Sequence, residues 1–172
     1  IFQVYNCIYT LMEYAVGKSL YCRLAENEPD LSSRNCRQWT VELVQAVQKM
    51  QEVGVAHRNL TLHHVLFNES DHVKIAAWSK SVIYWDPSQG GAALLQKPER
   101  RSRKNSYLPP ECFRCAYDPS KVDIWSIGVL MVAMNTRRVP FSADCGFKFS
   151  AQWRQFVTKH AINTLLRAAC NK

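Results

Sequence analysis

The segment of this chain with the densest chemistry is His57-Arg58-Asn59-Leu60-Thr61-Leu62-His63-His64, which holds three imidazoles, a guanidinium and an amide. Together with His72, these histidines have the nitrogen donors that zinc and copper prefer. His63 and His64 are adjacent, however, and on extended backbone they would point in divergent directions. The spacing also fixes no carboxylate or thiol beside them, so the ligand set is incomplete. We therefore expect no metal site, and we expect ordinary core or surface histidines.

The cysteines support a similar conclusion. Cys112 and Cys115 form a single C-x-x-C, whereas a structural zinc site needs four ligands and no second pair has suitable spacing. The seven cysteines are an odd number without paired spacing, which favours a reducing compartment over a disulfide framework. The cysteines therefore favour the cytoplasm or the nucleus, and a cytoplasmic location is expected.

Length and composition indicate one compact unit. The chain has 172 residues and 47% hydrophobic content, enough to bury a core of substantial size. Its most apolar stretch, 122–134, is too short to cross a bilayer and contains Asp123, so no membrane association is expected. The net charge is +8, and five of the eight residues in 97–104 are basic. This stretch is polar and has no aromatic residues, which favours a solvated loop over a nucleic-acid site.

The expected elements follow from periodicity. Residues 4–14 are rich in β-branched and aromatic types and predict a strand. A helix should begin at Ser32 or Ser33 and end near Gly54, because apolar residues then recur every three or four positions. Runs at 65–67 and 73–76 predict a hairpin, and 80–106 predict a long loop. Helices are expected over 122–134 and over about 156–169.

A series of ordered motifs makes the chain resemble a eukaryotic protein kinase from about Ile8 to Lys172. The catalytic-loop and metal-binding signatures of that family are H-R-D-L-x-x-x-N and D-F-G, and 57–64 and 77–79 have their spacing. The other matching segments are Leu11-Met12-Glu13-Tyr14, Val73-Lys74-Ile75-Ala76, Tyr107-Leu108-Pro109-Pro110-Glu111, Asp123-Ile124-Trp125-Ser126-Ile127-Gly128 and Met134-Asn135-Thr136-Arg137-Arg138-Val139-Pro140-Phe141. Among the protein kinases, the sequence as a whole is most similar to the calmodulin-dependent group and, within that group, to the testis-specific serine kinases.

This resemblance implies a mainly α fold, the C-terminal lobe of a protein kinase, in which a helical bundle carries a small β-hairpin next to the catalytic loop. The chain is expected to be a single domain fragment over 1–172. Residues 1–16 would end the N-terminal lobe and form the hinge, and 17–172 would form the C-terminal lobe, with an activation-segment-like loop at 80–111. No G-x-G-x-x-G phosphate loop occurs, and the third-strand Lys has no counterpart, so the N-terminal lobe is expected to be absent.

The same resemblance implies that the reactive side chains are missing. The family uses one Asp as the catalytic base, and an Asn with a second Asp as metal ligands. These positions are Asn59, His64 and Ala77 here, and Thr61 stands where the family has a Lys. Because an amide cannot accept a proton and Mg²⁺ requires oxygen ligands, no catalytic residue is intact and no cofactor is expected. If ATP bound, the hinge residues Met12, Glu13 and Ala15 would face the adenine.

The remaining matches imply structural roles. His57 should pack on Trp78, and Asp123 should accept hydrogen bonds from the catalytic-loop backbone, since a lone carboxylate in an apolar helix would be costly. Glu111 closes the activation segment, and its usual Arg partner would fall beyond Lys172.

Arg58 pairs with a loop phosphate in active members of the family. Here the corresponding loop is basic, and Arg58 beside it would be repelled unless an anion intervened. We therefore hypothesise that this loop docks on an acidic or phosphorylated protein, or is itself phosphorylated at Ser102 or Ser106. Its basic residues are Lys97, Arg100, Arg101, Arg103 and Lys104.

Three functions are consistent with these patterns. The first is a pseudokinase that acts as a binding scaffold. The second is a weak or atypical serine/threonine kinase that uses ATP and Mg²⁺ and is completed by an N-terminal lobe outside this chain. The third is a structural component of a larger cytoskeletal assembly, such as a flagellum. Nucleic-acid binding is the weakest alternative, because basic charge without stacking aromatic residues is poor support for it.

Overall fold

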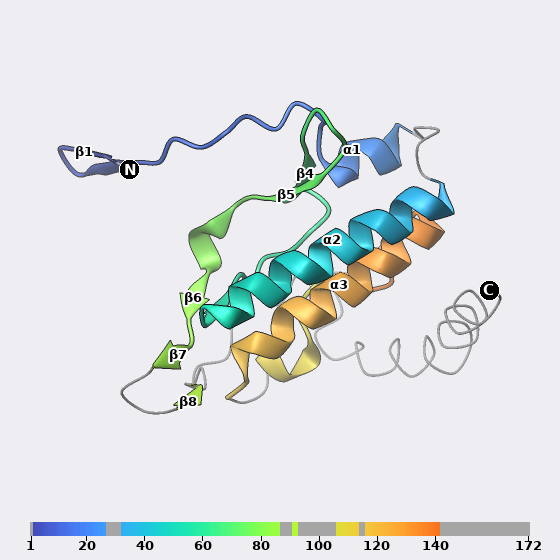
Figure 1. The fold of residues 1–172 in the computed structure, drawn as a ribbon. Helices are drawn as coiled ribbons and strands as arrows, with labels where there is room; N and C mark the ends of the chain where they lie inside the picture. Colours follow the sequence, from blue (N-terminus) through green and yellow to red (C-terminus); the bar gives the residue numbers. More distant parts are fainter. Residues whose placement is uncertain (1, 27–31, 87–90, 93–105, 114–115, 142–172) are drawn as a thin grey trace.

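The computed structural model describes residues 2–26, 32–86, 91–92, 106–113 and 116–141. Two long helices, α2 (Ser33–Glu52) and α3 (Pro119–Thr136), pack side by side, and the other elements lie around them (Figure 1). The short helical elements are α1 (Leu20–Ala25), η1 (Trp78–Lys80) and η3 (Pro110–Phe113). Among the described residues, no helix is both long and apolar enough to span a membrane.

Helix α2 begins and ends as its sequence predicts. The Ser32 hydroxyl accepts a hydrogen bond from the Asn35 N–H, which satisfies one of the unpaired donors of the first turn. The helix then ends just before Gly54, whose φ of +69° is strained for any residue with a Cβ. Its buried stripe recurs at three- and four-residue spacing and consists of Cys36, Trp39, Leu43, Val47 and Met50.

Helix α3 is apolar on most of its surface because it lies inside the molecule. Asp118 caps its first turn through the Ser120 N–H, and Pro119 occupies a position where no donor is needed. Leu130 and Ala133 join the core of α2, and Val129 packs with Phe141 in a second cluster. The buried helix expected over 122–134 therefore exists and is somewhat longer.

Within the described ranges, the strands form four short antiparallel ladders. They are β1 (Phe2–Val4) with β2 (Cys7–Tyr9), β3 (Val55–Ala56) with β6 (Val82–Ile83), β4 (Val65–Phe67) with β5 (Val73–Ile75), and β7 (Trp85–Asp86) with β8 (Gly91–Ala92). The β4–β5 pair is the predicted hairpin, in the register Val65 to Ile75. The β3–β6 pair brings the segment before residue 57 against the segment after residue 80.

The N-terminal segment differs from the single strand expected over 4–14. Residues 2–9 form a tight hairpin that extends away from the two long helices, and 10–15 have no regular structure (Figure 1). Leu11, Met12 and Tyr14 are 80%, 67% and 87% exposed. A strand needs a neighbouring ladder for its N–H and C=O groups, and the described residues offer none to 10–14.

Two further expectations need correction. The loop predicted over 80–106 contains the strands β6, β7 and β8. Each strand has only two residues, which is too short for a periodic pattern to indicate it in the sequence. The six-residue helix α1 was not predicted, although Ser19 caps it by accepting from the Cys22 N–H. The helix expected over 156–169 lies outside the described residues.

Buried Arg23 connects α1 to the β4–β5 hairpin. Its guanidinium lies 3.9 Å from the Phe67 ring centroid and 5.3 Å from that of Trp39. The same group donates to the Gly17 carbonyl and forms an ion pair with Asp71. A Cβ on Gly17 would lie 2.8 Å from Phe67, so only glycine allows this close approach.

Candidate functional site

The loop 57–64 joins β3 to β4 and is anchored to α3 by Asp123. The two oxygens of this buried carboxylate accept the His57 and Arg58 N–H groups, each at 2.7 Å. Burial raises the pKa of Asp123, and the two hydrogen bonds and the positive charge of Arg58 offset part of the rise. Because the acceptors bind main-chain donors, this anchor does not depend on the identity of the side chains at 57 and 58.

His57 forms the second anchor of the loop. Its ring is fully buried and meets Trp78 edge to face, with ring centroids 4.7 Å apart. Nε2 donates to the Ala76 carbonyl at 3.0 Å, and Nδ1 accepts from the Asn59 N–H at 3.3 Å. Burial lowers the pKa of His57 to about 4, so this imidazole is neutral at physiological pH.

The structure brings together three of the four positions where the sequence suggests lost chemistry. His64 Nδ1 donates to the Asn59 carbonyl at 2.7 Å, and the His64 carbonyl accepts the Ala76 N–H at 3.0 Å. Ala77 follows directly, with φ +66° and ψ +55°, a left-handed conformation that alanine adopts at a cost of about 1–2 kcal/mol. The side chains at positions 59, 64 and 77 end in an amide, an imidazole and a methyl group.

Thr61, the fourth such position, is buried inside the loop. Its hydroxyl oxygen is shielded from solvent and has no hydrogen-bond partner among the described residues. Its carbonyl accepts the His64 and Val65 N–H groups at 3.1 and 3.2 Å, which closes the turn into β4. A neutral, enclosed threonine supplies none of the positive charge of a lysine.

Arg58 has partners within the fold. Its Nη2 donates to the Tyr117 hydroxyl at 2.9 Å, and its Nη1 donates to the Lys80 carbonyl at 3.2 Å. Its guanidinium carbon lies 5.9 Å from the centroid of the Tyr117 ring. Sequence reasoning missed Tyr117, because no spacing pattern links it to a residue 59 positions earlier.

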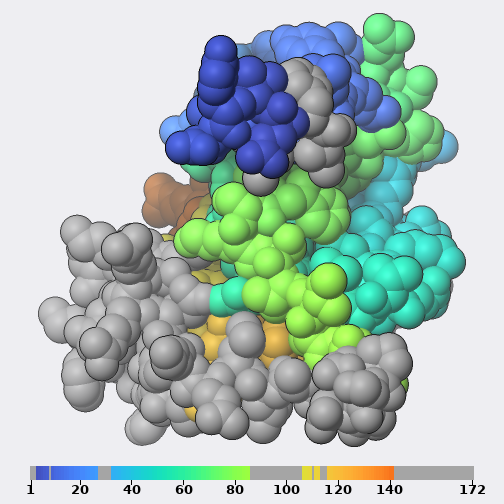
Figure 2. Space-filling view, turned by 90° about the vertical axis from the view of Figure 1, so that its left-hand side faces the viewer, coloured from blue at the N-terminus to red at the C-terminus, as the bar shows by residue number. Residues whose placement is uncertain are grey.

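Other predicted residues lie apart from this cluster. Met12, Glu13 and Ala15 are in the segment between β2 and α1, and the Glu13 carboxylate binds Lys74 Nζ at 2.7 Å, a pairing that the sequence did not reveal. Glu111 is exposed in η3 and makes an interaction of its own. In the space-filling view, the segment from β5 to β6 forms the middle of one face, below the N-terminal residues (Figure 2).

The proposed docking loop falls almost entirely outside the described residues. Only Ser106 is described, and it is half-buried. The remaining positions of that hypothesis lie outside and are Lys97, Arg100, Arg101, Ser102, Arg103 and Lys104.

The histidines lie in different environments. His63 stacks on Tyr21 at 4.1 Å between ring centroids, and His72 Nδ1 binds the Glu42 carboxylate at 2.9 Å. In the part of the chain that the structure describes, no group of three or more His, Cys, Asp or Glu side chains could hold a metal ion. Cys112 is buried, and Cys115 lies outside the described residues.

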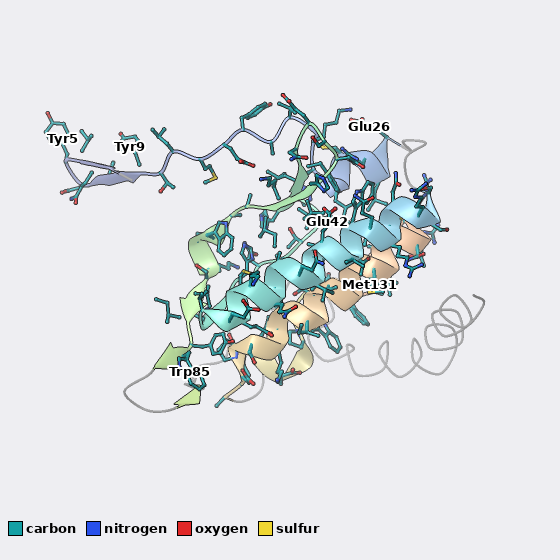
Figure 3. The ribbon with its side chains drawn as sticks, in the orientation of Figure 1. Tyr5, Tyr9, Glu26, Glu42, Trp85 and Met131 are labelled. Carbon is teal, nitrogen blue, oxygen red and sulfur yellow. The ribbon has the colours of Figure 1, made fainter. Side chains whose placement is uncertain are left out.

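Glu42 connects α2 to the β4–β5 hairpin near the centre of Figure 3. Its carboxylate accepts the Val73 N–H at 2.7 Å and a hydrogen bond from Gln38 at 3.0 Å, in addition to the contact with His72. Burial by itself would raise the pKa of Glu42, but these hydrogen bonds outweigh it and lower the pKa. The hairpin that leads to Ala77 is thereby fixed to the core.

Comparison with known proteins agrees with this architecture. The model of the protein kinase domain family matches residues 1–169. The chain is 31% identical over 172 residues to the hormonally up-regulated neu tumor-associated kinase of Mus musculus, covering 96% of this chain and 22% of that protein. It is also similar to the serine/threonine-protein kinase grp of Drosophila melanogaster (30% over 142 residues, 80% of this chain and 26% of that protein) and to the CBL-interacting protein kinase 11 of Oryza sativa subsp. japonica (31% over 135 residues, 78% and 26%).

The chain thus spans only about a quarter or less of the length of these relatives. The family match nevertheless extends over nearly every residue, and the loop 57–64, its anchor Asp123 and the β4–β5 hairpin lie within it. The chain therefore belongs to the protein kinase domain family.

Proposed function

We propose that this chain is a catalytically impaired kinase domain, a pseudokinase, that acts as a binding scaffold or structural component. The observation that carries the proposal is the pair of hydrogen bonds that join Asn59 to His64 and His64 to Ala76, in a loop whose positions 59, 64 and 77 carry no carboxylate. An amide in place of the general base typically costs about 10²–10⁴-fold in rate.

Metal binding would be affected more severely. Ala77 has no ligand atom, and the imidazole of His64 offers nitrogen to an ion that prefers oxygen. Without Mg²⁺, the charge that develops on a transferring phosphoryl group loses its main stabiliser. Thr61 removes a further positive charge, so we expect neither ATP–Mg²⁺ binding nor phosphoryl transfer.

The proposed partners are proteins with acidic or phosphorylated surfaces in the cytoplasm, bound through the basic residues between 97 and 104. If this docking is correct, binding by the unmodified protein should weaken as the salt concentration rises, and changing Lys97, Arg100, Arg101, Arg103 and Lys104 to Ala should abolish it. Undiminished binding by that variant would exclude the loop as the docking element.

Nucleotide binding is the decisive test of the main proposal. The unfolding temperature of the intact protein would be measured with ATP, with and without Mg²⁺, beside a transfer assay with labelled ATP. A ligand at about 100 times its Kd stabilises the folded state by about 2.7 kcal/mol, which such a measurement detects easily. We expect no Mg²⁺-dependent stabilisation and no transfer.

A matched variant makes this test specific. The triple change Asn59→Asp, His64→Asn and Ala77→Asp restores the family's catalytic base and its two metal ligands, and it should gain a Mg²⁺-dependent shift. A Mg²⁺-dependent shift in the unmodified protein that His64→Ala abolishes would contradict the proposal. A triple variant that gains nothing would contradict our assignment of the deficit to these positions.

A weakly active serine/threonine kinase is the second candidate. It is favoured by the kinase names of the similar proteins and by the anchored loop, which would still position a substrate hydroxyl near Asn59. Transfer by the intact protein that is slow, requires ATP and Mg²⁺, and rises in the triple variant would support this candidate instead.

A further inference from the structure

Arg58 connects three segments that are far apart in the sequence. Its own N–H is held by Asp123 of α3, while its guanidinium reaches the Lys80 carbonyl and the Tyr117 hydroxyl. Lys80 ends η1 and directly precedes the segment that leads into β6, and Tyr117 lies just before α3. A single side chain therefore joins the loop 57–64, the segment after Ala77 and the segment before α3.

The arrangement of Arg58 is fixed by several independent features. Its φ of +61° is a left-handed conformation, which a non-glycine residue retains only when its surroundings hold it there. Tyr117 is 4% exposed and packs with Leu108, Cys112 and Val122, so its hydroxyl is presented from a rigid site. The Arg–hydroxyl and Arg–carbonyl bonds use two different ends of the guanidinium fork, a geometry that lysine cannot reproduce.

The charge of Arg58 is also balanced internally. Asp123 is 2% exposed and interacts electrostatically with Arg58 while it binds the two main-chain N–H groups. A buried carboxylate of this kind supplies the negative charge that a cation near the protein interior needs. The guanidinium thus has a compensating anion and two hydrogen-bond acceptors, all from the fold.

We infer that Arg58 and Tyr117 form an internal clamp that positions the loop 57–64 against the segments at Lys80 and Tyr117 without phosphate or any other external anion. The Tyr117 hydroxyl takes the place of a phosphate oxygen on the guanidinium. The inference concerns regulation and is independent of the proposed loss of catalysis, because it holds whether or not phosphoryl groups are transferred. It replaces the expectation that Arg58 requires an anion.

Tyr117→Phe tests the clamp, since it removes only the hydroxyl and keeps the ring. Tyr84→Phe is the matched control: Tyr84 is also buried, and no hydrogen bond to Arg58 involves it. In hydrogen–deuterium exchange on the intact protein, Tyr117→Phe should speed exchange by roughly tenfold or more at residues 57–60 and 79–83 together, as expected for one lost charge-assisted hydrogen bond. Tyr84→Phe should not speed exchange at both segments together.

The absence of an anion requirement has a separate readout. Thermal unfolding is followed with increasing inorganic phosphate at constant ionic strength for the unmodified protein, Arg58→Gln and Lys121→Gln, where Lys121 supplies a matched exposed positive charge. We expect the same phosphate-induced shift in all three proteins. A saturable shift that disappears only in Arg58→Gln would overturn the inference, and so would loosening in Tyr117→Phe that is confined to the residues around 117.

Discussion

Acidification should destabilise the folded protein through His57. An unfolded imidazole titrates at its ordinary pKa of 6.5, whereas burial lowers the pKa of His57 in the folded state to about 4. Between these two values the unfolded state binds more protons, so the free energy of unfolding must fall as the pH falls from 6.5 towards 4. A difference of about 2.5 pKa units corresponds to a loss of about 3 kcal/mol at most, because each unit is worth about 1.4 kcal/mol.

The assay is urea-induced unfolding at a series of pH values for the unmodified protein and for His57→Gln, whose amide can still donate to the Ala76 carbonyl. The variant starts from lower stability, but its dependence on pH through this window should be flatter by up to about 3 kcal/mol. Other titrating groups, including Asp123 with its raised pKa, are present in both proteins and cancel in the difference. Equal pH dependence in the two proteins would show that the buried neutral imidazole of His57 does not cause the loss of stability at low pH.

Substitutions at three positions test the surroundings of the site, each by urea-induced unfolding. Asp123→Ala leaves two buried N–H groups without an acceptor and should cost about 2–5 kcal/mol, whereas a cost near zero would mean that the loop does not depend on this anchor. Ala77→Gly should stabilise by roughly 1 kcal/mol because glycine tolerates positive φ, while Ala77→Val should destabilise; the reverse order would refute the strained backbone. Glu42→Gln should cost about 1–2 kcal/mol at neutral pH and progressively less as the pH falls through the lowered pKa of Glu42, because protonation has by then removed the same charge from the unmodified protein. A cost that does not change with pH would argue against a stabilising role for the ionised Glu42 carboxylate.

Much of the fold could be predicted where local patterns decide it. The stripe from Cys36 to Met50 and the Ser32 cap placed α2 correctly, since a helix with one buried face carries its period in the sequence. The turn residues between Phe67 and Val73 indicated the β4–β5 hairpin for a similar reason. Helix α1 escaped prediction because six residues are too few to show a period.

The contacts of the site were less predictable. The positions of Asn59, His64 and Ala77 follow from spacing within one family, and the structure joins them through hydrogen bonds of the backbone and of the His64 ring. The pairs Arg58–Tyr117 and Glu13–Lys74 join distant segments through long side chains. Such pairings depend on how loops approach each other in space, and a single sequence contains no record of that approach.

The way in which Asp123 holds the loop has an evolutionary consequence. A carboxylate that binds two peptide N–H groups anchors the loop through donors that every amino acid except proline carries, so this anchor does not depend on the side chains at 59, 61 and 64. Ancestors of this chain could therefore have exchanged the groups at 59, 61 and 64 one mutation at a time while each intermediate still folded. The same tolerance means that a few point mutations could restore those groups as easily as they removed them.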